Sequence, residues 1–273
     1  MTQDADFKEG VDCVVVNYKT YDHLEKFIQS YIFQYGGVAS DLYVIDVDVD
    51  AELYDYASER LSAYTKEIQI CYLPLSYNAG YSGACNFGAT LGNHDTIAFF
   101  NSDTQLFDNT LESCRTVLHS DPSYAVVGPL QVNSDGLMTH GGIFGTNSKP
   151  DFAGRWKSKV LPAYRKIEEA VTVSGSAYFV KRSIWEDFTN DPEWQSLYPS
   201  IEGAFLPTPH YYEETWFSYL ARHRGYKVIY NGEAEMIHEW HKSSKVGEVE
   251  ALHLDKSRAM FRNTCDKYGI EHD

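Results

Sequence analysis

Carboxylates follow the short apolar runs of this chain at places where they could bind a cation. The clearest is Asp103, which comes directly after the run Ile97-Ala98-Phe99-Phe100 and the pair Asn101-Ser102. Because such a run predicts a buried strand, the carboxylate would lie at the edge of a sheet, where a hard cation bridging a diphosphate could use it. The segment Asn-Ser-Asp-Thr is also typical of a capped turn or helix start. Asp103 is thus a candidate metal ligand with a structural alternative.

A second set of polar side chains follows two earlier apolar runs. Asn17 and Tyr18 follow the first run, and Asp46, Asp48 and Asp50 alternate after the second. Alternation at the strand period would place three carboxylates on one face, but like charges oppose that extension of the strand. We therefore expect Asp46 to end the strand and face a ligand. Asp48 and Asp50 would belong to the following loop or helix start, with a cation site there as the weaker alternative.

Two adjacent glutamates begin a predicted helix. Glu213 and Glu214 precede the apolar positions Trp216, Phe217 and Leu220, and the helix dipole alone favours carboxylates at such a start. A carboxylate there, beside a long loop, is also well placed to act as a general base, which contributes about 10²–10⁴ in rate. The position by itself leaves both roles open.

A histidine-rich segment and the lack of phosphate-binding motifs narrow the chemistry. His238-Glu239-Trp240-His241 has its histidines three residues apart, whereas a zinc protease needs them four apart on one helix. This spacing argues against a zinc hydrolase and leaves His238 as a single metal ligand at a strand end or as a packed or surface histidine. The glycine-rich motifs of dinucleotide enzymes and P-loop enzymes follow none of the predicted strands, which argues against both classes.

These residues need a sheet to bring them together. The first 130 residues alternate apolar runs with amphipathic stretches, which predicts an α/β fold with a mostly parallel sheet flanked by helices. The predicted strands are residues 12–17, 42–46, 68–73 and 96–100, and the predicted helices lie around residues 24–32 and 53–64. The remaining prediction comprises antiparallel structure at 126–181, an irregular loop at 189–209, a helix at 212–224, strands at 227–230 and 234–238, and a final helix at 249–268. In such a sheet, ligands bind beyond the carboxyl ends of the strands.

Charge and cysteine usage limit the partners and the location. The formal charge of −16 would repel nucleic acid and an anionic membrane unless a local basic patch intervened. The candidate patches, residues 155–159 and 222–227, are short and mixed with apolar residues, which indicates solvated surface. Five scattered cysteines without a C-x-x-C pair indicate a reducing compartment, and the sequence shows neither a leader nor a run of about 18 apolar residues. We expect a cytoplasmic protein without a membrane span.

The motifs of the chain, taken in order, resemble those of a known enzyme family. They are Val14-Val15-Val16-Asn17-Tyr18, Asn78-Ala79-Gly80-Tyr81-Ser82-Gly83-Ala84-Cys85-Asn86, Asn101-Ser102-Asp103-Thr104, Val173-Ser174-Gly175-Ser176, Tyr212-Glu213-Glu214, residues 222–225, His238 and Phe261-Arg262-Asn263. The set spans nearly the whole chain and resembles the inverting family two glycosyltransferases of GT-A fold, especially their rhamnosyltransferase- and galactofuranosyltransferase-like branch. The resemblance implies a single GT-A domain over residues 1–273, with a nucleotide-sugar-binding half (1–130), an acceptor and catalytic half (131–246) and a C-terminal helix (247–273).

This resemblance implies transfer of a sugar from a nucleotide-diphosphate donor to an acceptor hydroxyl with inversion. Asp103 would be the last acid of a D-x-D-type motif that binds Mn²⁺ or Mg²⁺, with His238 as a further ligand and Asn101 in place of the first acid. Glu214 would be the catalytic base and Glu213 its neighbour. The implied donor-binding residues are Asn17, Tyr18, Asp46, Asn78, Gly80, Asn86, Asn101, Ser102, Asp103 and Gly175.

The chain departs from the family pattern at two places. The second strand of the family normally ends in Asp-Asn-x-Ser-x-Asp, of which only Asp46 and Asp50 are present here. The helix motif, normally Glu-Asp-x-Asp, is Glu213-Glu214-Thr215-Trp216, so a tryptophan replaces the second aspartate.

Two other classes of protein remain as alternatives. A sugar nucleotidyltransferase shares the nucleotide-diphosphate chemistry, but it usually has a basic, glycine-rich N-terminal loop where this chain has only Lys19. A non-catalytic nucleotide-sugar or glycan-binding protein would fit the altered acidic loop and Trp216. Turnover of a donor separates these classes.

Overall fold

The structure is a computed structural model that describes residues 7–34, 37–48, 59–62, 64, 70–239 and 248–272. Its strands are β1 (Lys8–Asn17), β2 (Ser40–Asp46), β3 (Ile70–Pro74), β4 (His94–Asn101), β5 (Thr104–Leu106), β6 (Tyr124–Val132), β7 (Met138–His140), β8 (Ile143–Thr146), β9 (Lys149–Phe152), β10 (Ile167–Ala170), β11 (Ala177–Lys181) and β12 (Lys227–His238). Its helices are α1 (Tyr21–Gln34), α3 (Gly80–Gly88), α4 (Thr110–His119), the 3-10 helix η1 (Pro162–Tyr164), α5 (Arg182–Thr189), α6 (Pro192–Leu197), α7 (Glu213–His223) and α8 (Glu248–Tyr268).

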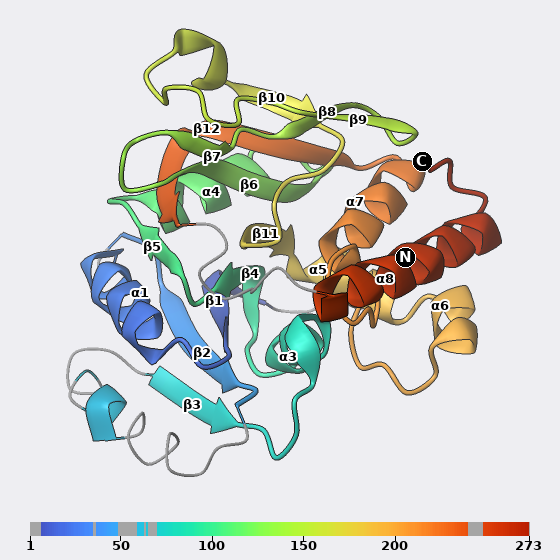
Figure 1. Ribbon diagram of the computed structural model, residues 1–273, viewed down its shortest axis with the longest axis horizontal. Helices are drawn as coiled ribbons and strands as arrows, with labels where there is room; N and C mark the ends of the chain where they lie inside the picture. Colours follow the sequence, from blue (N-terminus) through green and yellow to red (C-terminus); the bar gives the residue numbers. More distant parts are fainter. Residues whose placement is uncertain are drawn as a thin grey trace.

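One large sheet organises the described residues (Figure 1). Its strand order is β10-β12-β6-β11-β4-β1-β2-β3, with β5 added on β12 and β7 on β6. β1 runs parallel to β2 and β4, β2 to β3, and β6 to β12, whereas β11 runs antiparallel between β4 and β6. The carboxyl ends of β1, β2, β3, β4, β6 and β12 therefore lie along one edge of the sheet, together with the start of β11. We call this edge the carboxyl edge.

Alternation of side chains along the strands builds a core on each face of the sheet. On β1, Val14 and Val16 belong to one buried cluster and Cys13 and Val15 to the other. The cluster of Val14 also contains side chains from α3, α5, α6, α7 and α8, and the cluster of Val15 contains side chains from α1 and α4. Helices therefore cover both faces, as a largely parallel sheet requires.

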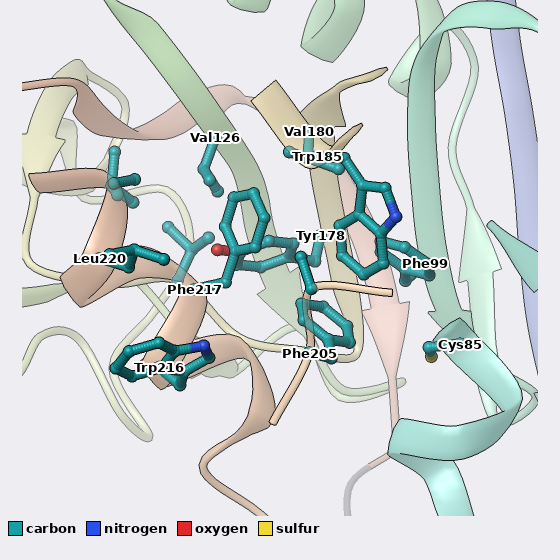
Figure 2. Close-up of a cluster of buried hydrophobic side chains, with 14 of the residues drawn as sticks. Cys85, Phe99, Val126, Tyr178, Val180, Trp185, Phe205, Trp216, Phe217 and Leu220 are labelled. Atoms are coloured by element: carbon teal, nitrogen blue, oxygen red, sulfur yellow. The ribbon is translucent and has the colours of Figure 1, made fainter. Parts of the chain in front are cut away.

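The core beneath α7 is rich in aromatic rings. Figure 2 shows Phe217 of α7 among Trp185, Tyr178 and Phe205, and the rings of Trp185 and Phe217 stack with centroids 5.5 Å apart. Trp216, the residue that departs from the family motif, is fully buried and stacks on Trp194 at 5.6 Å. Burying these rings fixes the position of α7, and with it the glutamates at its start.

Most predicted elements are confirmed. The strands predicted at 12–17, 42–46 and 96–100 lie within β1, β2 and β4, and the helices predicted at 24–32, 212–224 and 249–268 correspond to α1, α7 and α8. The strand predicted at 68–73 is β3, of which the described part begins at Ile70. Of the helix predicted at 53–64, only residues 59–62 and 64 are described, and residues 59–62 are helical.

Two predictions are corrected by the structure. The strands predicted at 227–230 and 234–238 are one strand, β12, whose register shifts between Asn231 and Glu235, where the Asn231 side chain accepts from the backbone N–H of Glu233 at 3.1 Å. The loop predicted at 189–209 contains α6, which Asp191 caps by accepting from the Trp194 N–H at 3.0 Å. The antiparallel structure predicted at 126–181 is confirmed, because β6 pairs antiparallel with β7 and β11, β8 with β9, and β10 with β12, whereas β6 also runs parallel to β12. None of the described helices is long and apolar enough to span a bilayer.

Candidate functional site

Polar side chains from β1 and β2 meet at the carboxyl edge. Asp46, which ends β2, accepts from Asn17 Nδ2 at 3.2 Å and from the Tyr72 hydroxyl at 2.6 Å. Burial, followed by the hydrogen bond to Asp46, raises the pKa of Tyr72 well above its ordinary value, so this hydroxyl stays a donor. Asp46 also accepts from the backbone N–H of Asp48 at 3.0 Å. The structure therefore brings Asn17 and Asp46 together, as the sequence predicts, and orients both.

A hydroxyl pair connects this group to the end of β4. Thr20 Oγ1 donates to Asn17 Oδ1 at 3.0 Å, and it lies 2.6 Å from Ser102 Oγ. Asn101 ends β4, and its backbone carbonyl accepts from Thr104 Oγ1 at 2.8 Å. Tyr18 is 43% exposed beside these residues, with the Lys19 ammonium 5.3 Å from its ring centroid. An aromatic face and a positive charge thus lie next to the polar end of the sheet.

Asp103 lies beside His238, as the two metal-ligand predictions require. β5 follows Asp103 directly and pairs with the end of β12, with Thr104 opposite His238. This pairing leaves Asp103 Oδ1 3.7 Å from His238 Nε2. Asp103 is only 3% exposed, and both of its carboxylate oxygens lack a hydrogen-bond partner among the residues that the structure describes. A buried carboxylate without partners is costly unless a cation compensates it, so this pair fits a divalent cation.

Gln131 is a site residue that the sequence analysis missed. It lies near the end of β6, where its Oε1 atom is 3.0 Å from His238 Nδ1 and accepts from Ser176 Oγ at 2.8 Å. Its Nε2 atom is buried, and no described residue forms a hydrogen bond with it. The available signal was one amide within the otherwise apolar strand Tyr124–Val132, at a strand end. Only the sheet order shows that this strand end lies beside His238.

The segment before β11 joins the two halves of the site. Ser174 Oγ lies 2.9 Å from Ser176 Oγ, and the Ser174 N–H donates to Nε2 of His140 at 3.0 Å. Burial, and next the charge of His238, lower the pKa of His140 to about 3, which agrees with its role as an acceptor. The Gly175 carbonyl accepts from the Tyr81 hydroxyl at 2.5 Å. These bonds hold the backbone of residues 174–176 in one position.

Gly175 faces the carboxylate of Glu214. A Cβ atom at position 175 would lie 3.3 Å from Cδ and 3.4 Å from Oε2 of Glu214, which is tighter than nearly all contacts of this kind. Glycine therefore allows the carboxylate to lie against the backbone of the segment before β11. Glu214, the candidate general base, and the Asp103–His238 pair are thus connected through Gly175, Ser176 and Gln131.

The two glutamates at the start of α7 differ in their surroundings. Glu213 is buried and accepts from Thr208 Oγ1 at 3.1 Å, whereas Glu214 is half-buried. Burial, and next the charge of Glu214, raise the pKa of Glu213 to about 8, and burial also raises the pKa of Glu214. A raised carboxyl pKa suits a group that exchanges protons near neutral pH.

The remaining predicted donor-binding residues lie on α3 or shortly before it. Asn78 is exposed, and its Oδ1 atom accepts from the Gly80 N–H at 2.9 Å, where Gly80 has a φ of +68°. Glycine suits that left-handed conformation at the helix start. Asn86 lies in the last turn, where it donates to the Phe205 carbonyl and accepts from the Phe205 N–H, each at 3.0 Å. The Asn86 amide thus holds the segment around Phe205 in place.

Asp12, Asp41 and His94 form a second group that could hold a metal ion, with ligand atoms within 4.8 Å of one another. This group lies at the amino ends of the strands, because Asp12 pairs with Asp41 near the start of β2 and His94 begins β4. Asp12 already accepts from Arg182 Nη2 at 2.5 Å and contacts His94 Nδ1 at 2.7 Å. Arg182 therefore already compensates the charge of the buried Asp12 carboxylate, which a cation at this site would need as a ligand.

Three solved structures of low sequence identity share this fold. "GalNAc-T7 with UDP, GalNAc and Mn2+" matches with a TM-score of 0.62 and 12% identity over 86% of this chain and 45% of that chain. The mannosyltransferase PcManGT from Pyrobaculum calidifontis, in complex with GDP-Man and Mn²⁺, matches with a TM-score of 0.63 and 11% identity over 96% and 65%. S. aureus TarS matches with a TM-score of 0.56 and 14% identity over 84% and 36%.

This chain therefore spans less than two thirds of the length of each of these three proteins. No curated protein matches it by sequence. Residues 12–188, more than half of the chain, match the family model described as glycosyl transferase family 2, and they contain β1, β2 and β4 with the polar residues that follow them. The chain has a GT-A fold and belongs to glycosyl transferase family 2.

Proposed function

We propose that this protein transfers a sugar from a nucleotide-diphosphate donor to an acceptor hydroxyl, with metal assistance and with inversion at the anomeric carbon. The observation that carries the proposal is the buried, unpartnered carboxylate of Asp103 beside His238, at the edge where Asn17 and Asp46 also converge. The relatives with bound UDP and GDP-Man, each with Mn²⁺, support the same ligand chemistry. The rhamnosyltransferase- and galactofuranosyltransferase-like branch remains our narrower proposal.

The donor would bind along the carboxyl edge. Asn17, Asp46 and Ser102 supply hydrogen-bonding groups that Tyr72 and Thr20 hold in place. The exposed ring of Tyr18 would stack on the nucleotide base. Asn78 and Gly80 at the start of α3 and Asn101 after β4 complete the proposed donor site, and Asn86 would support it through the segment around Phe205.

Asp103 and His238 would hold the divalent cation, Mn²⁺ or Mg²⁺. When bound there, the cation supplies Lewis-acid stabilisation of the negative charge that grows on the leaving diphosphate. Asp103 brings a carboxylate that needs compensation, and Gln131 orients the imidazole of His238. These side chains would fix the diphosphate relative to the sugar. The anomeric carbon would then be open to attack from the face opposite the diphosphate.

Glu214 would be the general base. Its carboxylate lies against Gly175, between the segment before β11 and the start of α7, and it would take the proton of the acceptor hydroxyl as that oxygen attacks the anomeric carbon. Attack from the face opposite the leaving diphosphate inverts the configuration. Glu213, which is buried and has a raised pKa, would stay protonated near neutral pH and would leave the negative charge to Glu214.

We further propose the division of labour that the sequence predicts: residues 1–130 bind the donor, residues 131–246 bind the acceptor and carry the base, and the C-terminal part, 247–273, contributes the helix α8. A cytoplasmic location is part of the same proposal. None of the five cysteines, all of which the structure describes, forms a disulfide, and four of them are buried, which suits a reducing compartment.

The test is a thermal-shift and calorimetric screen of UDP- and GDP-sugars, each with and without Mn²⁺, followed by turnover and NMR assignment of the product anomer. We expect one nucleotide to stabilise the protein only when Mn²⁺ is present, since a ligand that binds the folded state stabilises it by mass action. Donor binding without release of nucleoside diphosphate, with water or with a panel of hydroxyl acceptors, would instead favour a non-catalytic nucleotide-sugar-binding protein. A retained anomeric configuration would contradict the proposed base.

A further inference from the structure

A surface beside β7 and β12 combines positive charge with exposed apolar side chains. It is formed by residues 149–166, which run from β9 through η1 to the start of β10, and we call it the basic excursion. Figure 1 shows its η1 end standing out beyond β10 at the top of the view, at the opposite end of the molecule from β3. The part of the excursion that projects in this way can contact a partner without help from neighbouring elements.

The net charge of the basic excursion is opposite in sign to that of the remaining chain. Its six basic residues and single acidic residue, Asp151, give a formal charge of +5, against −16 for the whole protein, which leaves −21 on all other residues. The basic residues are Lys149, Arg155, Lys157, Lys159, Arg165 and Lys166. Such an asymmetry orients a protein when it approaches an anionic surface.

Part of this charge anchors the excursion, and part of it faces outward. Glu235 of β12 pairs with Lys159 and, at 2.5 Å, with Arg165. Lys157 and Lys166 are exposed, and no carboxylate of the described residues lies within ion-pair distance of either. The two anchored side chains fix the excursion on the sheet, and the two exposed lysines remain available to a partner.

Apolar side chains project from the same segment. Trp156 is 51% exposed and Val160 is 71% exposed, and Phe152 and Leu161 are exposed as well. The exposure of Trp156 does not come from a loose backbone, because its N–H donates to the Met138 carbonyl at 2.7 Å and its φ of +62° is a conformation that non-glycine residues rarely adopt. The fold therefore holds a tryptophan outward at a local conformational cost.

We propose that the basic excursion docks this protein on an anionic lipid surface. Exposed Trp, Val and Leu beside Lys and Arg are the side chains of interfacial membrane binding: the apolar groups enter the headgroup boundary and the cations contact anionic headgroups. The negative charge elsewhere does not prevent contact, because a projecting segment can reach the surface while charges farther than about 10 Å from it are screened by salt. The protruding shape favours a lipid surface over an extended polyanion, which is usually held in a groove. This inference goes beyond the proposed transfer reaction and gives residues 155–159 a role beyond the solvated surface that the sequence indicates.

The test is co-sedimentation of the full chain with vesicles of phosphatidylglycerol and phosphatidylcholine, compared with vesicles of phosphatidylcholine alone. We expect binding to the anionic vesicles only, with loss of binding at about 0.5 M salt. The double variant Lys157→Glu/Lys166→Glu should lower the partition coefficient by about tenfold or more, since each basic residue near such a surface contributes on the order of 1 kcal/mol. Trp156→Ala should lower it several-fold, and tryptophan emission should shift to the blue on binding of the wild-type chain but not of Trp156→Phe.

Matched variants on α1 test whether vesicle binding depends on the basic excursion or on any exposed charge or apolar ring. Lys26→Glu changes an exposed lysine and Phe33→Ala removes a ring that is 80% exposed, and both should bind anionic vesicles like the wild type. Several results would overturn the proposal: no sedimentation with anionic vesicles, equal loss of binding in the α1 variants, or tighter binding to soluble heparin than to the vesicles. A dimer in solution that is broken by Trp156→Ala would assign the surface to a second copy of the chain instead.

Discussion

Nδ1 of His238 lies 3.0 Å from Oε1 of Gln131, and this contact determines which ring nitrogen faces Asp103. An amide oxygen only accepts, so Nδ1 of a neutral His238 carries the proton. Nε2, 3.7 Å from Asp103 Oδ1, then keeps its lone pair. A histidine oriented in this way is prepared to act as a metal ligand before any ion arrives.

Gln131→Leu should therefore lower the affinity for Mn²⁺ by about 10–100-fold, because the imidazole loses the acceptor that fixes its tautomer. Calorimetric titration of Mn²⁺ in the presence of the bound nucleoside diphosphate measures this. Gln131→Glu keeps an oxygen acceptor for Nδ1–H and should retain more of the affinity than Gln131→Leu. Equal affinities in the wild type and Gln131→Leu would show that Gln131 has no part in orienting His238.

Asp103→Asn should abolish the Mn²⁺-dependent stabilisation by donor without lowering the melting temperature of the metal-free protein. The reason is that the carboxylate has no hydrogen-bond partner, so removing its charge relieves a desolvation cost when no cation is bound. Asp95→Asn is the matched control, because Asp95 pairs with Arg115 at 2.5 Å and its loss should lower the melting temperature. A large drop in metal-free stability of Asp103→Asn would indicate a structural role instead.

Glu214→Gln should reduce the rate of transfer by about 10²–10⁴-fold while donor affinity stays within error, because the amide cannot accept the proton of the acceptor hydroxyl. Single-turnover transfer and calorimetric donor binding, measured on the same preparation, separate the two effects. Glu213→Gln, one residue away, is the control and should keep most of the transfer rate. A wild-type rate of transfer in Glu214→Gln would show that Glu214 is not the general base.

Glu213 should make the protein less stable as the pH rises from about 4.5 to about 8. Its pKa is raised by burial in the folded state, so across this interval the folded protein holds a proton that the unfolded chain has lost. The free energy of unfolding therefore falls with increasing pH over that window. Denaturant titrations at several pH values should show a flatter dependence for Glu213→Gln, and identical slopes would contradict the raised pKa.

Asp41→Asn should leave the Mn²⁺-dependent affinity for donor unchanged, although Asp41 belongs to the group with Asp12 and His94. Arg182 already pairs with Asp12 there, and the group lies at the amino ends of the strands, away from the carboxyl edge. The measurement is the same Mn²⁺ titration as for Gln131→Leu. A tenfold loss of Mn²⁺ affinity in Asp41→Asn would move the metal site to that end of the sheet.

Local patterns were sufficient to predict the residues that end each strand. Asn17, Asp46 and Asp103 all follow apolar runs, and parallel strands bring their carboxyl ends to one edge whatever their exact order. The prediction of an irregular loop at 189–209 was wrong because Asp191-Pro192 is a helix-capping signal that begins α6. The prediction of two strands in place of β12 was wrong because the Asn231 side chain replaces ladder hydrogen bonds where the register shifts, and the strand continues.

The sequence by itself thus determined the fold class, the helix of Glu213 and Glu214, and the polar carboxyl edge, since each depends on periodicity within a few residues. Only the tertiary structure decided that Gln131 lies against His238, that Gly175 faces Glu214 and that Trp156 points outward from a basic segment. The first two relationships join residues on β6, β12, α7 and the segment before β11, which are far apart in the chain. They depend on strand order and on the packing of a shared core, which local periodicity does not encode.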